Sequence, residues 1–288
     1  MIAELPARER LHWRVMCDPA EPILADHRPG GAPLLGTVGN LDMIASGLAE
    51  RVPEGEIVAI EEVRLGPPLI FADKAPLPLD IAADTATGAA TGADGCLAVR
   101  SFSAPSPADA PHLAACFRMA RRFAPAPAFA APTPGPDAIT TADIYAVLFH
   151  GPAFRVIDRA ALAGSMLVAA SCATLPPLRR PATASRLAPR AIEFGLQAAG
   201  LLQLALDGSM AIPLGIERIE RFADTDVGTG AALFARAERT PDGRFAIEVG
   251  HGGATIVRIT GYATTPLPFA HDDRAARTLA ARLNERRR

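Results

Sequence analysis

The sequence of 288 residues predicts an α+β fold in which short antiparallel strands surround a long apolar helix, twice in succession. Residues 37–51 and 190–206 each have apolar side chains at helical spacing. Short apolar or alternating segments, separated by Pro, Gly and Asp, accompany each helical run. Strands grouped around one long helix are typical of an antiparallel sheet that wraps around that helix. We therefore expect two sheets, each with its own central helix.

The first half contains these elements in a simple order. Residues 11–17, LHWRVMC, alternate partly between apolar and polar and predict a first strand. In the helix at 37–51, Val38, Leu41, Ile44 and Leu48 share one face, which should pack against a sheet. We expect Asp42, on the same helix, to be solvated or to cap it. Strand-like segments occupy most of residues 56–123.

A Pro- and Ala-rich stretch at 123–136 divides the chain into halves of similar size. Its prolines favour an extended linker that packs poorly. The predicted domains are therefore 1–124, a linker at 125–137, and 138–288. The second half repeats the order of strands, apolar helix and strands. Its charged end, residues 272–288, predicts a solvated terminal helix, with docking on the body or recognition of a partner as the alternatives.

Composition limits the classes of function. A net charge of −2 gives no indication of nucleic-acid binding, and 49% hydrophobic with 21% charged residues is typical of a globular protein. The four cysteines lie far apart, as expected for reduced thiols in a cytoplasmic protein. The N-terminus lacks the apolar core of a signal peptide. Polar residues interrupt the apolar helix at 192–206, so we expect no membrane span.

Two stretches carry candidate chemistry. Glu193 and Gln197 stand four residues apart and share one face of an otherwise apolar helix. An acid in such surroundings is costly unless it is paired or used. Far upstream, His27 precedes a Gly- and Pro-rich turn that leads to a helix beginning near Gly36 or Thr37. The N-terminus of a helix presents unpaired N–H donors to a polarised oxygen.

Four segments together resemble the dehydratase domains of polyketide synthases, which have a double-hotdog fold. They are His-x-x-x-Gly at 27–31, FHGPAF at 149–154 with its Gly-Pro-x-Phe pattern, Glu-x-x-x-Gln at 193–197, and IPLGIERI at 212–219. They stand in the family's order and spread over most of the chain. The resemblance implies removal of water from a β-hydroxyacyl thioester to give a trans-2-enoyl product, in polyketide or fatty-acid-like biosynthesis.

The resemblance also implies a role for each matching residue. His27 would be the base, Glu193 the acid, and Gln197 would orient the acid. Backbone N–H groups around Gly36 and Thr37 would polarise the thioester carbonyl. The remaining substrate-binding residues would be Gly31 in the first motif and those lining an acyl tunnel, namely His150, Gly151, Pro152 and Phe154. No metal or redox cofactor is implied. The substrate would arrive on the phosphopantetheine arm of an acyl carrier protein.

Three positions depart from the family's pattern. Glu193 stands where Asp is usual in polyketide dehydratases, Gly36 where the first motif usually ends in Pro, and His150 where Tyr is frequent. These departures leave open a catalytically degenerate domain that binds acyl chains or holds an assembly together. An isomerase, a hydratase or a thioesterase on the same fold also remains open.

The rest of the chain carries weaker indications. We expect four histidines to occupy surface or strand positions, because none has an acid or cysteine at metal-ligand spacing: His12, His112, His251 and His271. The sequence contains no recognisable ketosynthase, reductase or carrier segment, so we expect it to act in trans or as one domain of a larger synthase, with other synthase components as possible partners. Both a monomer and a homodimer are compatible with the fold.

Overall fold

The computed structural model describes residues 10–73, 75–85, 95–103, 110–130, 133–179, 185–267 and 272–285. His271 lies outside these ranges. Within them, no helix is long and apolar enough to cross a membrane.

Twelve described strands form one antiparallel sheet in the order β1-β3-β4-β5-β2-β9-β12-β11-β10-β8-β7-β6. The first five are β1 (Arg10–Cys17), β2 (Glu56–Leu65), β3 (Leu77–Thr85), β4 (Gly95–Phe102) and β5 (Leu113–Ala120). The others are β6 (Ile139–Thr140), β7 (Ile157–Ala163), β8 (Met166–Ser171), β9 (Ala211–Arg221), β10 (Phe234–Arg239), β11 (Phe245–His251) and β12 (Ala254–Pro266). Each half supplies a contiguous set of strands, and β2 pairs with β9 to join the sets. The expectation of two separate sheets is therefore corrected to one continuous sheet.

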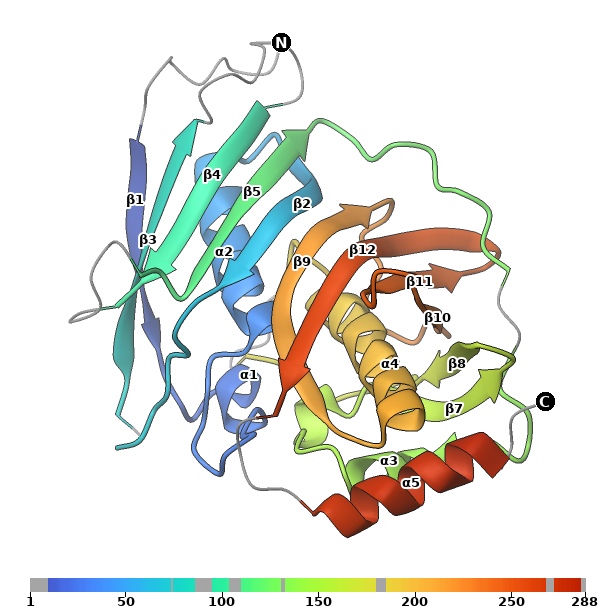
Figure 1. Cartoon of the computed structure of the whole chain (residues 1–288). Helices are drawn as coiled ribbons and strands as arrows, with labels where there is room; N and C mark the ends of the chain where they lie inside the picture. The colour runs from blue at the N-terminus through green and yellow to red at the C-terminus, as the bar shows by residue number, and fades with distance from the viewer. Residues whose placement is uncertain are drawn as a thin grey trace.

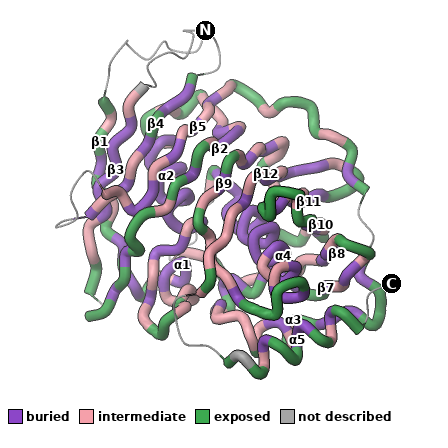
Figure 2. Tube along the Cα trace, in the orientation of Figure 1, coloured by how far each residue is buried: buried purple, intermediate pink, exposed green. Residues whose placement is uncertain are grey.

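Two long helices lie inside this sheet: α2 (Thr37–Arg51) and α4 (Pro189–Asp207). Figure 1 shows α2 against the strands of the first half and α4 enclosed by those of the second, and Figure 2 shows both as mostly buried. Helix α4 starts with Pro at its first position, and Gly208, with φ of +67°, follows its last residue as the C-cap. Gly195 permits a close approach to the sheet, because a Cβ there would lie 2.9 Å from Ile247. The predicted helices at 37–51 and 190–206 are confirmed.

Shorter helices complete the fold. They are α1 (Pro22–Ala25), α3 (Thr141–Tyr145), the 3-10 turn η1 (Pro152–Phe154) and the terminal α5 (Asp273–Glu285). Helix α5 lies along α3 and α4 in Figure 1. Its Leu279 and Leu283 are buried, its Arg282 pairs with Asp143, and Asn284 donates to the carbonyl of Ala205 at 2.8 Å. The terminal helix therefore packs on the body, which corrects the expectation that it is solvated.

Charged side chains reinforce the seam between β2 and β9. Glu61 on β2 accepts from Arg218 on β9 and lies 2.7 Å from Nε of Arg118 on β5. The guanidinium of Arg221, buried on β9, donates to the carbonyl of Ile57 on β2 at 2.8 Å. The bonds of Arg218 and Arg221 cross from one half of the chain to the other, so they tie the two sets of strands together.

The predictions of a solvated or capping Asp42 and of four reduced cysteines are wrong. Asp42 is 1% exposed and pairs with Arg179 at 2.7 Å, and Ser185 also donates to its carboxylate, so residues from before α4 cover it. Cys96 and Cys116 form a disulfide, with Cα atoms 6.0 Å apart on the neighbouring strands β4 and β5. Strand pairing brings these two cysteines together from positions 20 residues apart in the sequence. Cys17 and Cys172 are the free thiols of the described chain.

Candidate active site

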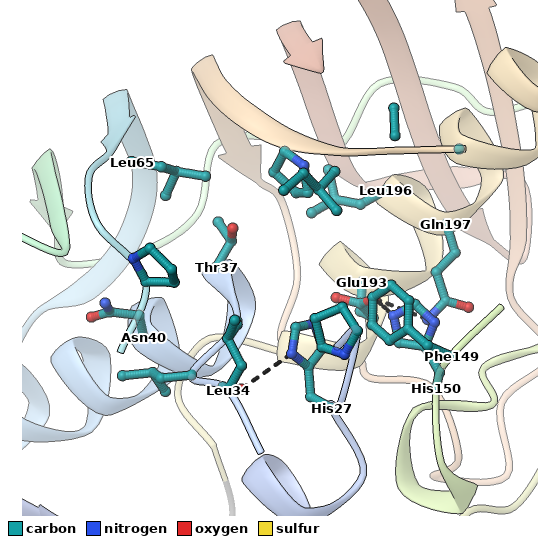
Figure 3. Close-up of a pocket in the computed structure, with 18 of the residues that line it drawn as sticks. His27, Leu34, Thr37, Asn40, Leu65, Phe149, His150, Glu193, Leu196 and Gln197 are labelled. Carbon is teal, nitrogen blue, oxygen red and sulfur yellow. Dashed lines mark hydrogen bonds and ion pairs between the residues drawn. The ribbon is translucent and has the colours of Figure 1, made fainter. Parts of the chain in front are cut away.

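A cavity of about 260 Å³ lies between the two halves of the chain and contains most of the candidate residues. Its walls come from the turn after α1, the start of α2, the segment after β2, the segment before η1, the middle of α4 and the start of β9. Figure 3 shows His27, His150 and Glu193 close together on one side, with Thr37 and Asn40 opposite. Most of the wall is apolar, and it includes Leu34, Leu65, Leu69, Leu196 and Ile212. The site is thus a largely apolar pocket with a few polar groups gathered at one place.

His27 enters the cavity from the turn that follows α1. Its Nδ1 lies 3.1 Å from the carbonyl oxygen of Leu34. Because a carbonyl can only accept, Nδ1 carries a proton and Nε2 has the free lone pair of the neutral ring. Burial, and then the charge of His150, lower the pKa of His27 to about 4. The imidazole is therefore neutral near pH 7 and able to take a proton.

Glu193 projects from the second turn of α4 and is 8% exposed. Its Oε1 accepts from Nε2 of Gln197 at 2.9 Å and lies 3.1 Å from Nε2 of His150. Burial acts to raise the pKa of Glu193, but the hydrogen bond and charge of His150, with His27 and Gln197, outweigh burial and lower it. Glu193 therefore rests as a carboxylate.

A second hydrogen-bonded layer holds Gln197 in place. Its Nε2 also donates to the carbonyl of Phe154 at 3.0 Å, and its Oε1 accepts from the hydroxyl of Tyr145 at 2.7 Å. That hydroxyl in turn accepts from the backbone N–H of Ile157 at 3.0 Å. Because each polar atom of the Gln197 amide has a fixed partner, the amide keeps one orientation towards Glu193.

The segment from His150 to Ala153 is tied to both halves of the site. The backbone of His150 forms an antiparallel bridge with that of His27. Asp26, next to His27, accepts from the N–H of Gly151 through its carbonyl and from the N–H of Ala153 through its carboxylate, both at 2.7 Å. Arg190 on α4 donates to the carbonyl of Ala153 at 3.1 Å. Asp26 and Arg190 thus link the turn of His27 to the helix of Glu193.

The N-terminus of α2 faces the same cavity. Gly36 is the N-cap residue, and no side chain of the described chain caps it. Gly36 and Thr37 both line the cavity. Asn40, one turn further, also lines it, and its Oδ1 has no hydrogen-bond partner among the described residues. The start of this helix therefore offers free backbone donors to an oxygen in the cavity.

Sequence reasoning placed some of these residues and missed others. Of the ten predicted site residues, the cavity is lined by His27, Gly36, Thr37, His150, Glu193 and Gln197. The described residues that form its wall do not include Gly31, Gly151, Pro152 or Phe154. Gly31 belongs to a turn with φ of +87°. Phe154 is buried behind the site, with its ring centroid 6.2 Å from that of His27, because η1 turns it towards the core.

The residues that sequence reasoning missed are Asp26, Asn40, His112, Tyr145 and Tyr262. The prediction that His112 lies at the surface or in a strand is wrong, because His112 is buried and lines the cavity. Its ring nitrogens lie 2.7 Å from the hydroxyl of Ser103 and 2.6 Å from the carbonyl oxygen of Pro67. Tyr262 also lines the cavity. A buried amide such as Gln197 needs polar partners, so the sequence could have suggested a partner of the kind that Tyr145 provides. The places of the other missed residues are not indicated by any local sequence pattern.

One cluster of potential metal ligands occurs in the described chain, at Glu61, Cys96 and Cys116. It lies on β2, β4 and β5, among residues that do not line the cavity described above. Its cysteines are joined in the disulfide and its carboxylate is paired with Arg118 and Arg218. Because the sulfur atoms are bonded to each other and the carboxylate is paired with arginines, these three residues do not form a ligand set for a metal.

Comparisons with known proteins agree with this architecture. The family described as polyketide synthase dehydratase N-terminal domain matches residues 125–274, which contain α4. Among solved structures, a dehydratase from work on the borrelidin and fluvirucin polyketide synthases is 25% identical, with a TM-score of 0.66, covering 92% of this chain and 93% of that one. The dehydratase domain from the CurF module of the curacin polyketide synthase is 15% identical, with a TM-score of 0.67 and coverages of 92% and 96%.

A pyran synthase domain from module nine of the sorangicin pathway has the same fold at 19% identity, with a TM-score of 0.65 and coverages of 89% and 94%. No curated protein sequence matches the chain. The match of the family covers more than half of the chain, and the solved structures share its fold over nearly their whole length. The chain therefore belongs to the polyketide synthase dehydratase family.

Proposed function

We propose that this chain removes water from β-hydroxyacyl thioesters to give trans-2-enoyl thioesters, with His27 as the base and Glu193 as the acid. Members of the family are hydro-lyases that act on such intermediates in polyketide synthesis. The observation that carries the assignment of residues is that His27 and Glu193, from opposite halves of the chain, line one largely apolar cavity. A base and an acid on the same substrate are what the elimination requires.

The α-proton goes to Nε2 of His27. The ring is neutral, its Nδ1–H points to the carbonyl of Leu34, and that carbonyl stabilises the imidazolium as it forms. Negative charge then develops on the thioester oxygen. The free N–H groups at the start of α2, around Gly36 and Thr37, stabilise this charge.

The hydroxyl leaves as water after it receives a proton through Glu193. The Cβ–O bond breaks as the Cα–Cβ double bond forms, so one proton leaves the substrate at Cα and one proton joins the departing oxygen. Gln197 fixes the direction of the carboxyl group through its bond to Oε1. Glu is one methylene longer than Asp, and its place in the second turn of α4 brings Oε1 to His150 and Gln197 without distortion of the helix.

The elimination needs a base and an acid, both of which the chain provides, so we propose no metal or redox cofactor. The substrate is carried on the phosphopantetheine arm of an acyl carrier protein, the arm entering the cavity and the carrier staying outside. We further propose that residues 1–124 and 138–288 are two hotdog units joined by residues 125–137, because each supplies one central helix and its own set of strands.

The test is turnover of 3-hydroxyacyl thioesters of several chain lengths on a carrier protein, followed by mass spectrometry for loss of water. Wild type is compared with His27→Ala and Glu193→Gln, and with His251→Ala as a control at an exposed histidine. We expect a fall of about 100-fold to 10,000-fold in the first two variants and none in the control. Wild type that is silent with every chain length would favour an acyl-binding domain, and a shifted double bond in the product would indicate an isomerase.

A further inference from the structure

We propose that His150 stores the proton that Glu193 delivers, so that the acid of this site is a His150–Glu193 pair rather than a lone carboxyl group. The proposal rests on the dehydratase function above and concerns the source of its second proton. His150 lines the cavity and contacts Glu193. Its contacts point to a chemical role.

The geometry around Glu193 favours its ionised form. Two N–H donors, from Gln197 and His150, meet the same oxygen, Oε1. Donors directed at a carboxylate stabilise the charged form. A carboxylate has no proton to give, so the proton for the leaving hydroxyl must come from a neighbour. Gln197 does not titrate, which leaves His150 as the titratable side chain that the described structure places in contact with Oε1.

His150 is suited to exchange a proton with Glu193. It is 7% exposed, and its Nδ1 has no hydrogen-bond partner among the described residues. Its ring stacks on Phe149, with centroids 4.2 Å apart, and this contact fixes the plane of the imidazole. The proton of His150 therefore has one direct acceptor in the described chain, Oε1 of Glu193, at 3.1 Å. In apolar surroundings an imidazolium and a carboxylate together are net neutral, and each lowers the cost of burying the other.

The other ionisable groups near His150 have different partners. The Nε of Arg155 donates to the backbone carbonyl of His150 at 3.3 Å. Asp26 is bound to backbone N–H groups of the same segment. Tyr145 is bound to Gln197, and Tyr262 lines the cavity near Glu193, where burial raises the pKa of its hydroxyl. His27 contacts the ring of His150 with centroids 5.7 Å apart, and its Nδ1 is held by Leu34.

The proton transfers conserve atoms and charge. His27 takes the α-proton, the Cβ–O bond breaks, and Glu193 passes a proton to the departing oxygen. In the same step the proton on Nε2 of His150 moves to the carboxyl group. Glu193 ends as a carboxylate, His150 as a neutral imidazole and His27 as an imidazolium. The pair then recovers its proton from His27 or from solvent.

The experiment compares two leaving groups in wild type, His150→Gln, His150→Tyr and His27→Ala. Gln and Tyr keep a hydrogen-bond donor but do not carry a titrating imidazole. With 3-hydroxyacyl thioesters, which need an acid, we expect His150→Gln to lose about 100-fold in kcat. With 3-chloroacyl thioesters, whose chloride leaves without a proton, we expect the same variant to stay within about 3-fold of wild type. His27→Ala should lose both reactions.

The pH dependence gives a second measurement. In wild type, the fall of kcat for dehydration on the alkaline side should come when the pair loses its proton. In His150→Gln the proton must rest on Glu193 alone, so the fall should begin at lower pH. Equal losses with both leaving groups would show that His150 only positions the site, and an unchanged rate and pH profile would also overturn the proposal. Wild type that eliminates chloride but never water would instead contradict the proposed dehydratase function.

Discussion

The imidazole of His27 lies directly against the Cα of Gly36. A Cβ at position 36 would be 2.8 Å from both Cε1 and Nε2 of the ring and 3.1 Å from Nδ1. The backbone of Gly36 has an ordinary φ of −70°, so glycine is needed here for space and not for conformation. The glycine that departs from the family's usual Pro therefore leaves room for the ring of His27, the proposed base.

Gly36→Ala should displace the His27 ring and lower kcat/KM for dehydration by up to about 100-fold, because a shift on the order of 1 Å in a reacting group has this effect. Alanine tolerates the same backbone angles, so any loss of stability should come from the crowding against the ring and stay within about 1–3 kcal/mol. Gly95→Ala is a suitable control, because a Cβ there meets nothing within 4 Å. Steady-state kinetics of both variants would check this, and wild-type kinetics for Gly36→Ala would contradict the described ring position.

His27 should make the fold less stable in mild acid. Its pKa is lowered to about 4 by burial and by His150, so between about pH 4 and 6.5 the unfolded chain binds a proton that the native state does not. Stability therefore decreases as pH falls through this window, by about 3 kcal/mol at 1.4 kcal/mol per pKa unit. Urea unfolding of wild type and His27→Gln across this range would measure it. Parallel curves for the two proteins would contradict the prediction.

Asp226 should make the fold less stable as pH rises, which is opposite to the effect of His27. Burial raises its pKa to about 7 despite two backbone donors, the N–H groups of Ala191 and Val227, which both meet Oδ1. The native state then holds a proton that the unfolded chain lacks, so stability falls as pH rises from about 4 to 7.

Asparagine keeps the acceptor oxygen of Asp226 without the charge. Asp226→Asn should therefore be more stable than wild type above pH 7, by as much as about 4 kcal/mol, and close to it near pH 4. Thermal unfolding at several pH values would test this, with the exposed Asp158→Asn as control. A pH-independent difference would mean that Asp226 does not carry the proton.

Tyr145→Phe should weaken the support of Gln197. The change leaves the N–H of Ile157 and Oε1 of Gln197 without their present partner. Buried groups left unpaired cost about 1–3 kcal/mol, so the free energy of unfolding should fall by that amount. Dehydration should fall less than in Glu193→Gln, because Gln197 keeps its bonds to Glu193 and Phe154. Urea unfolding and kcat measured together would separate the two effects.

Asp26→Ala should loosen the link between the two halves of the site. It removes the acceptor for the N–H of Ala153 while the backbone bond from Gly151 remains. We expect a loss of about 1–3 kcal/mol in stability and a lower kcat. Asp26→Asn keeps one acceptor oxygen, so its losses of stability and of kcat should be smaller. Equal behaviour of the two variants would contradict a role for this hydrogen bond.

The two central helices, the family and six residues of the cavity wall could all be predicted from the sequence. Helical periodicity at 37–51 and 190–206 is a local property, because burial of one face selects apolar residues every three or four positions. The motifs around His27 and Glu193 are local as well. These features could be read from residues that are neighbours along the chain.

Contacts between segments that are distant along the chain could not be predicted in this way. The joining of β2 to β9, the pairing of Cys96 with Cys116, and the burial of Asp42 and α5 depend on which strands and loops become neighbours. The contact of His150 with Glu193 has the same origin, since it joins segments 43 residues apart. Periodicity tells which face of an element is buried but not which element covers it. The choice of partner, and with it the electrostatic environment of Glu193, arises only when the chain is packed.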